Sequence, residues 1–179
     1  MTIQYINPVA DCLTPMNPYS LSIESNQPAT IALVINNIVD CDVFMGLVGD
    51  ALRGLHPHLT IKSYPTRQIT CADNILMDQI AAECDAAVCA IGHCGSCTAG
   101  TVKDGIALVE RGIPAVSLIT EVFWDQADAL ARSLGWRDFP RLKLPYPIWG
   151  TESGTMGLIA NQTADELMPL LERSIADVA

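Results

Sequence analysis

The chain has 179 residues, half of them hydrophobic, and a net charge of −10 from 10 Lys and Arg against 20 Asp and Glu. This length suits a single domain with a sizeable core, and the acidic balance argues against nucleic acid or an anionic membrane surface as a partner, since both bind to basic faces. No apolar stretch reaches the roughly 18 residues of a membrane span, and the first residues lack the basic start and apolar core of a secretory signal.

Residues 1–29 are rich in proline, asparagine and serine. Such turn-forming residues predict an irregular, extended leader. Its scattered apolar residues suggest that the leader packs on the domain or on a neighbouring molecule. The remaining residues, 30–179, are expected to form one domain.

Apolar runs and helical spacings alternate through the rest of the chain. Five apolar or alternating runs predict strands over 31–35, 59–64, 85–91, 115–119 and 141–144. Helical spacing of apolar residues predicts helices over 41–54, 72–83, 98–111, 121–134 and about 163–175. Thr163 and Glu166 match a capping box at the start of the last helix.

Strands that alternate with helices at this pitch predict an α/β fold with a mostly parallel five-stranded sheet covered on both faces. Right-handed crossovers favour a doubly wound, flavodoxin-like topology with the strand order 2-1-3-4-5. The first and third strands are then neighbours, and the loops at their carboxyl ends, 36–40 and 92–98, face each other across a crevice. The loop after the fourth strand, at Thr120 and Glu121, opens onto the same edge.

The segment that joins the third strand to its helix, residues 92–98, has the sequence GHCGSCT. Unpaired backbone N–H groups and the positive end of the macrodipole at a helix N-terminus favour a thiolate over a thiol. Cys94 and Cys97 have the spacing of dithiol redox sites, in which the second thiol resolves an adduct on the first. Cys94 is the predicted nucleophile because it stands first, at the turn.

Polar residues around this segment complete the predicted site. His93 and Glu121 are acid–base candidates, and Thr98 with the helix amides is expected to stabilise negative charge. The predicted substrate-binding residues are Asn36, Asn37, Asp40, Gly95, Ser96, Thr98 and Thr120. Thr98, Asp40 and Glu121 also suit the plainer role of helix cap.

Seven cysteines without a small-scaffold pattern argue against a disulfide framework and indicate a reducing cytoplasm. Cys84 and Cys89 are expected in the core as small apolar residues.

No metal site and no cofactor are predicted. Zinc needs more ligands than His93, Cys94 and Cys97 provide, although Cys41 in the facing loop keeps a soft metal open as an alternative. The loop at 36–40 lacks the glycine-rich or hydroxyl-rich cradle that phosphate groups of nucleotides and flavins require.

Between residues 90 and 149 the chain resembles the UGSC-motif family, named for a selenocysteine-Gly-Ser-Cys signature that many members carry as Cys-Gly-Ser-Cys. The residues that carry the resemblance are Gly92, Cys94 to Thr98, Val102, Asp104, Glu110 to Pro114, Thr120, Glu121, Phe123, Leu134, Gly135 and Pro145 to Pro147. The same order of motifs is more distantly similar to the selenoprotein B subunits of glycine reductase and D-proline reductase.

By position, the resemblance implies that Cys94 is the attacking chalcogen and Cys97 its paired cysteine. The sequence departs from the family pattern at Ile38, where a lysine is common, and at His93, where an aspartate is common. Both changes remove or invert charge beside the sulfur, which implies a different substrate.

Together these features predict a cysteine-dependent enzyme, or the catalytic subunit of one, that acts on a small molecule in a reductase-like reaction. Two alternatives remain open: a non-redox lyase or hydrolase with a covalent cysteine intermediate, and a non-catalytic or metal-binding subunit of a hetero-oligomer. The long leader and the exposed-looking segment 149–157 favour assembly with a second subunit or a second copy.

Overall fold

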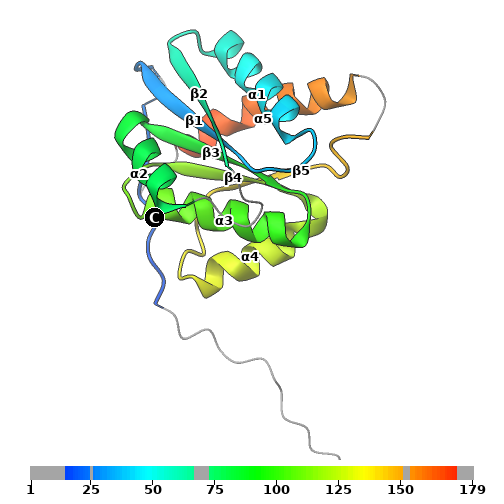
Figure 1. The fold of residues 1–179 in the computed structure, drawn as a ribbon. Helices are drawn as coiled ribbons and strands as arrows, with labels where there is room; N and C mark the ends of the chain where they lie inside the picture. The colour runs from blue at the N-terminus through cyan, green and yellow to red at the C-terminus, as the bar shows by residue number, and fades with distance from the viewer. Residues whose placement is uncertain (1–14, 25, 67–72, 151–153, 173–179) are drawn as a thin grey trace, which may run out of the picture.

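The computed structural model describes residues 15–24, 26–66, 73–150 and 154–172. Its sheet has five strands, all parallel, in the order β2-β1-β3-β4-β5 (Figure 1). The strands are β1 (Ala29–Ile35), β2 (Leu59–Pro65), β3 (Ala86–Gly92), β4 (Ala115–Thr120) and β5 (Arg141–Leu144). The predicted α/β class and strand order are confirmed.

Helices cover both faces of the sheet (Figure 1). One face carries α1 (Cys41–Leu55) and α5 (Thr155–Leu171), and the other carries α2 (Asn74–Glu83), α3 (Gly95–Val109) and α4 (Trp124–Ser133). A short 3-10 helix, η1 (Glu121–Phe123), precedes α4. Strand order reverses between β1 and β3, so the carboxyl ends of these two strands flank the switch point at which doubly wound proteins bind ligands.

The central strands are buried on both faces because each side meets a layer of helices. In β1, Ile31 and Leu33 pack toward α1 and α5, whereas Ala32 and Val34 pack toward α2, α3 and α4. Every residue of β3 is buried. This double burial explains why the strands read as continuous apolar runs rather than as an alternating pattern.

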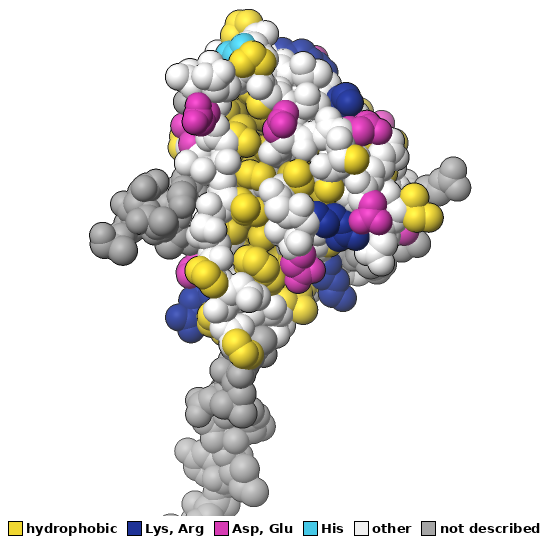
Figure 2. All heavy atoms as spheres, turned by 90° about the vertical axis from the view of Figure 1, so that its left-hand side faces the viewer, with side chains coloured by type: hydrophobic (Ala, Val, Ile, Leu, Met, Phe, Trp, Pro, Cys, Tyr) yellow, Lys and Arg dark blue, Asp and Glu magenta, His cyan; other side chains and the backbone are white. Residues whose placement is uncertain are grey.

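The described part of the predicted leader lies across the amino ends of the strands. The Asn17 N–H donates to the Gly135 carbonyl and the Ile23 N–H to the Leu171 carbonyl, while the Tyr19 ring is buried in the core. Figure 2 shows the face on that side of the molecule, where apolar side chains lie in the middle and charged ones around them. Residues 1–14 lie outside the described residues, and the boundary between a leader and a domain stays a prediction.

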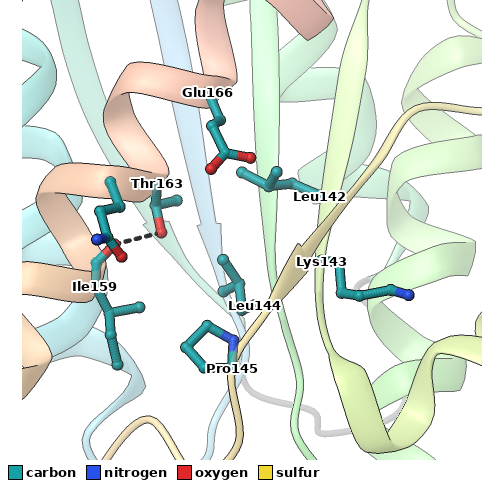
Figure 3. A pocket seen from close by; sticks show the side chains of 8 residues that line it. Leu142, Lys143, Leu144, Pro145, Ile159, Thr163 and Glu166 are labelled. Atoms are coloured by element: carbon teal, nitrogen blue, oxygen red, sulfur yellow. Dashed lines mark hydrogen bonds between the residues drawn. The ribbon is translucent and has the colours of Figure 1, made fainter.

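The predicted starts of α3 and α5 are wrong, and the predicted helix 121–134 is divided into η1 and α4. Helix α3 begins at Gly95 rather than at Thr98, and α5 begins at Thr155 rather than at Thr163. Thr163 is buried within α5, where its hydroxyl donates to the Ile159 carbonyl at 2.7 Å (Figure 3). A capping box therefore does not form there. Ile159 and Ala160 pack into the core and continue the apolar face of the helix N-terminal to Thr163.

Close packing of α3 on β4 yields a prediction about Gly105. Replacing a helical glycine by alanine ordinarily stabilises a protein by about 0.5–1 kcal/mol. A Cβ at Gly105, however, would lie 2.8 Å from Ser117 Oγ and closer still to the Phe139 ring. We expect Gly105→Ala to lower the free energy of unfolding by about 1–3 kcal/mol, measured by urea denaturation.

Gly46 in α1 provides the matched control, because a Cβ there would meet nothing within 4 Å. Gly46→Ala should raise the free energy of unfolding by about 0.5–1 kcal/mol. Equal effects of the two substitutions would contradict the close approach of α3 to the sheet.

Candidate functional site

The turn from β3 into α3 makes the Cys94 sulfur part of the helix N-terminus. Cys94 is the N-cap residue of α3, and its Sγ accepts a hydrogen bond from the Cys97 N–H at 3.2 Å. The sulfur therefore takes the position that a serine or aspartate oxygen takes at most helix starts. In the reduced protein this N–H and the helix dipole favour the thiolate.

Cys94 and Cys97 are joined by a disulfide bond. Cys94 is half-buried, whereas Cys97 is only 1% exposed and packs inside α3. Of the two sulfur-bearing residues, Cys94 is therefore the more accessible from solvent. The exposed Ser96 places its hydroxyl 3.5 Å from Cys94 Sγ.

Thr98 does not cap the helix, contrary to one of the two roles predicted for it. It lies within α3, fully buried, and its hydroxyl donates to the Cys94 carbonyl at 2.7 Å. The hydroxyl thus fixes the backbone of Cys94, because it holds the carbonyl of that residue over the first turn of the helix.

Three further contacts hold this turn in place. The buried Thr120 hydroxyl at the end of β4 donates to the Gly92 carbonyl at 2.8 Å, and Gln126 Nε2 of α4 donates to the Gly95 carbonyl at 2.8 Å. Gly92 allows the close approach of Thr98, since a Cβ at Gly92 would lie 2.9 Å from Thr98 Oγ1. Gln126 carries no signal in the sequence, because only the folded chain brings α4 to the start of α3.

His93 lies in a group of aromatic side chains. Its ring stacks on Trp149, with centroids 4.1 Å apart, and lies tilted by 33° against Tyr146 at 4.7 Å, while Phe123 of η1 lies edge-on to Tyr146. Burial lowers the pKa of His93 below its usual value, more than an interaction with its own backbone raises it. The imidazole is therefore neutral near pH 7, and its buried Nε2 makes no hydrogen bond with any described residue.

These aromatic contacts alter one expectation about the segment after β5. Trp149 is half-buried against His93 rather than exposed, and residues 151–153 lie outside the described residues. Tyr146 and Trp149 were not among the predicted site residues. The only signal for them was the Pro145 to Pro147 element within the family resemblance.

The loop after β1 is tied directly to β3. The Asn36 N–H donates to the Ala90 carbonyl at 3.0 Å, and Asn36 Nδ2 donates to the Ile91 carbonyl at 3.0 Å. Asn36 is 4% exposed, so this amide joins the two strands at the switch point. Two hydrogen bonds thus join the start of the 36–40 loop to β3, and a crevice between this loop and residues 92–98 stays a prediction.

Asn37, Asp40 and Glu121 are exposed on the rim of this edge of the sheet, and no hydrogen bond described here joins them to the dithiol. Asp40 occupies the N-cap position of α1 with a φ of 59°, but its side chain makes no capping hydrogen bond. Its side chain is therefore free for a ligand.

The remaining described cysteines, Cys41, Cys84 and Cys89, are buried thiols. Burial raises the pKa of Cys41 to about 12 and the pKa of Cys89 well above its ordinary value. Among the described residues, no three His, Cys, Asp or Glu side chains lie close enough together to hold a metal ion. Cys41 therefore does not complete a metal site with His93 and the dithiol.

The UGSC family model matches residues 5–173. The chain belongs to the UGSC family. No curated protein has significant sequence similarity to it. The more distant relation to selenoprotein B subunits stays a prediction. None of the helices in the described ranges combines the length and apolar character that crossing a membrane requires.

The lowered pKa of His93 makes a prediction about stability and pH. Since the folded-state pKa lies below the ordinary value of 6.5, the unfolded chain binds more protons as the pH falls through that value. The contribution of neutral, buried His93 to the free energy of unfolding is then fully present above about pH 6.5 and is lost as the pH falls below that value. We expect wild-type protein to lose more unfolding free energy than His93→Phe between about pH 7.5 and about pH 5.5.

The measurement is urea denaturation of both proteins at the two pH values. Phe should preserve the stacking on Trp149 and the ring contact with Tyr146, and every other titratable group is common to both proteins. Parallel loss of stability in the two proteins would show that His93 titrates as a solvated histidine.

Proposed function

We propose that this UGSC-family chain is a cysteine-dependent enzyme, or the catalytic subunit of one, that reduces a small molecule with its dithiol. The observation that carries the proposal is the Cys94 sulfur at the N-terminus of α3, half-buried and bonded to the buried sulfur of Cys97. One sulfur meets the substrate, and the other resolves the adduct.

The proposed cycle begins when the Cys94 thiolate attacks an electrophilic carbon of a substrate R–X. A C–S bond forms, the C–X bond breaks, and X leaves with the electron pair. The Cys97 thiolate then attacks Cys94 Sγ, so that the S–S bond forms and the C–S bond breaks. The electron pair goes to carbon, which takes a proton to give R–H. Two thiolates are oxidised to one disulfide, and the substrate gains two electrons.

The surrounding groups have defined roles in this cycle. The Cys97 N–H and the dipole of α3 stabilise the Cys94 thiolate before attack. The neutral imidazole of His93, whose Nε2 has no hydrogen-bond partner among the described residues, is the proposed proton acceptor for the Cys94 thiol. Glu121 on the rim is the proposed proton donor to the leaving group. Gly95, Ser96 and Thr98 shape the turn that receives the substrate.

An external thiol reductant must return the disulfide to the dithiol in each cycle. A thiol-bearing second subunit or a small-molecule thiol would serve as this electron donor. The cycle also requires a reducing compartment, which fits the cytoplasm expected from the cysteine content. It uses no bound cofactor, because the electrons come from the two sulfurs.

Trapping a mixed disulfide tests the division of roles between the two sulfurs. The variants carry Ser in place of Cys12 and Cys71, which lie outside the described residues. Reduced protein is treated with bis(2-hydroxyethyl) disulfide and analysed by intact mass. We expect Cys97→Ser to keep one mercaptoethanol adduct on Cys94, and protein with both cysteines to end as the internal disulfide without an adduct.

Cys94→Ser should remain unmodified on the same timescale, because Cys97 is buried. Cys84→Ser, which removes a buried thiol outside the site, is the control and should match the parent protein. Equal reaction of the Cys94→Ser and Cys97→Ser proteins would overturn the proposal. Full turnover by Cys97→Ser, once a substrate is found, would instead support a non-redox lyase or hydrolase.

A further inference from the structure

The carbonyl group of Cys94 accepts two hydrogen bonds from a single residue. The Thr98 N–H donates to it at 2.9 Å, as in an ordinary first turn of a helix, and the Thr98 hydroxyl donates to it at 2.7 Å. Thr98 is 0% exposed, so water does not compete for either contact. The N–H alone would complete the helical turn, and the hydroxyl is an additional donor on the same oxygen.

Close packing against β3 determines where the Thr98 hydroxyl lies. A Cβ at Gly92, the last residue of β3, would lie 2.9 Å from Thr98 Oγ1 and 2.7 Å from Cδ1 of Ile119. The Thr120 hydroxyl holds the Gly92 carbonyl at 2.8 Å. The side chain of Thr98 is therefore seated against a fixed part of the sheet.

The same contact occurs at Thr163 in α5, where no sulfur is involved. The buried Thr163 hydroxyl also donates to the carbonyl four residues earlier, that of Ile159, at 2.7 Å (Figure 3). In α3 the corresponding carbonyl belongs to the N-cap residue, Cys94, whose Sγ accepts the Cys97 N–H at 3.2 Å. The first turn of α3 thus holds the carbonyl and the sulfur of one residue together.

A donor on the Cys94 carbonyl favours the thiolate in two ways. A carbonyl oxygen carries partial negative charge, which opposes negative charge on the sulfur of the same residue, and a hydrogen bond to that oxygen offsets part of the opposition. Holding the carbonyl also keeps Sγ in the orientation in which it meets the Cys97 N–H. Because the Thr98 hydroxyl is buried, solvent screens both effects little.

We propose that Thr98 is a positioning residue for the sulfur: its hydroxyl, acting through the Cys94 carbonyl, increases the fraction of Cys94 that is present as thiolate. Thr98 needs no contact with a substrate for this role. The benefit to turnover rests on the proposed function, whereas the effect on the ionisation of Cys94 does not.

The pH dependence of Cys94 alkylation tests the proposal. The parent is the Cys97→Ser protein used above, which also lacks Cys12 and Cys71 and keeps the backbone N–H of residue 97. Its reaction with iodoacetamide is followed from about pH 5 to about pH 10, and modification at Cys94 is counted by peptide mass, because only the thiolate reacts. We expect Thr98→Val to raise the midpoint of this profile by about 0.5–1 pH unit.

Further ionisable groups around this turn are common to all the variants, so they cancel when the profiles are compared. They are His93 on β3, Asp104 in α3, Glu121 in η1, Asp125 in α4 and Asp40 before α1.

Two control variants separate the hydroxyl from general packing. Thr98→Ser keeps the hydroxyl, and Thr163→Val removes the same kind of buried contact from α5. Each should leave the midpoint within about 0.2 unit of the parent value. Urea denaturation checks that every variant is folded. If Thr98→Val does not fold, the smaller Thr98→Ala should give the same upward shift.

An unchanged midpoint in the folded Thr98→Val or Thr98→Ala protein would contradict the role of Thr98, and so would an equal shift in Thr98→Ser or Thr163→Val. Such results would leave Cys94 as the proposed nucleophile. The proposed function fails on a different observation, equal reaction of the Cys94→Ser and Cys97→Ser proteins with the disulfide reagent.

Discussion

The site depends on one hydrogen bond, from the Cys97 N–H to Cys94 Sγ, which makes a sulfur the cap of α3. A cap must lie at the first turn, so the sulfur is held where the strand ends and the backbone N–H groups are unpaired. The same spacing places Cys97 inside the first turn, within bonding distance and out of solvent. The geometry of this one turn therefore accounts for three features. Cys94 caps the helix, the helix N-terminus favours its thiolate, and the half-buried Cys94 is paired with the buried Cys97.

The sheet order supplies the surroundings that the turn alone lacks. Because β3 lies between β1 and β4, the loops after those strands reach the turn from both sides, Asn36 through the Ile91 carbonyl and Thr120 through the Gly92 carbonyl. Asn36 and Thr120 are both buried and donate to backbone carbonyls, so they hold the end of β3 in position. Among the predicted site residues, the exposed ones are Ser96 on the turn and Asn37, Asp40 and Glu121 on the rim.

The sequence predicted the layers of this fold because central strands buried on both faces leave continuous apolar runs and edge strands leave alternating ones. Five strand segments of these two kinds, with helices between them, allow few topologies. The prediction failed at helix starts whose position depends on tertiary contacts. Thr163 resembles a cap but is a buried residue of α5, and Cys94 caps α3 although capping rules favour oxygen-bearing side chains. The stacking of Trp149 on His93 joins residues 56 positions apart, which no local periodicity reveals.

The acidic rim disfavours a Cys94 thiolate, whereas the N-terminus of α3 favours it. The relative size of the two effects depends on distance and solvent screening. The N–H group is 3.2 Å from the sulfur and shielded by the turn, so solvent screens it little. Asp40 and Glu121 are exposed, and two unit charges separated by even about 4 Å in water interact by only about 1 kcal/mol. The contact at the turn therefore governs whether the sulfur is ionised. In the proposed reaction, the rim carboxylates would repel anions that approach the half-buried sulfur. The proposed Cys94 nucleophile would therefore favour electrophiles that are neutral or cationic.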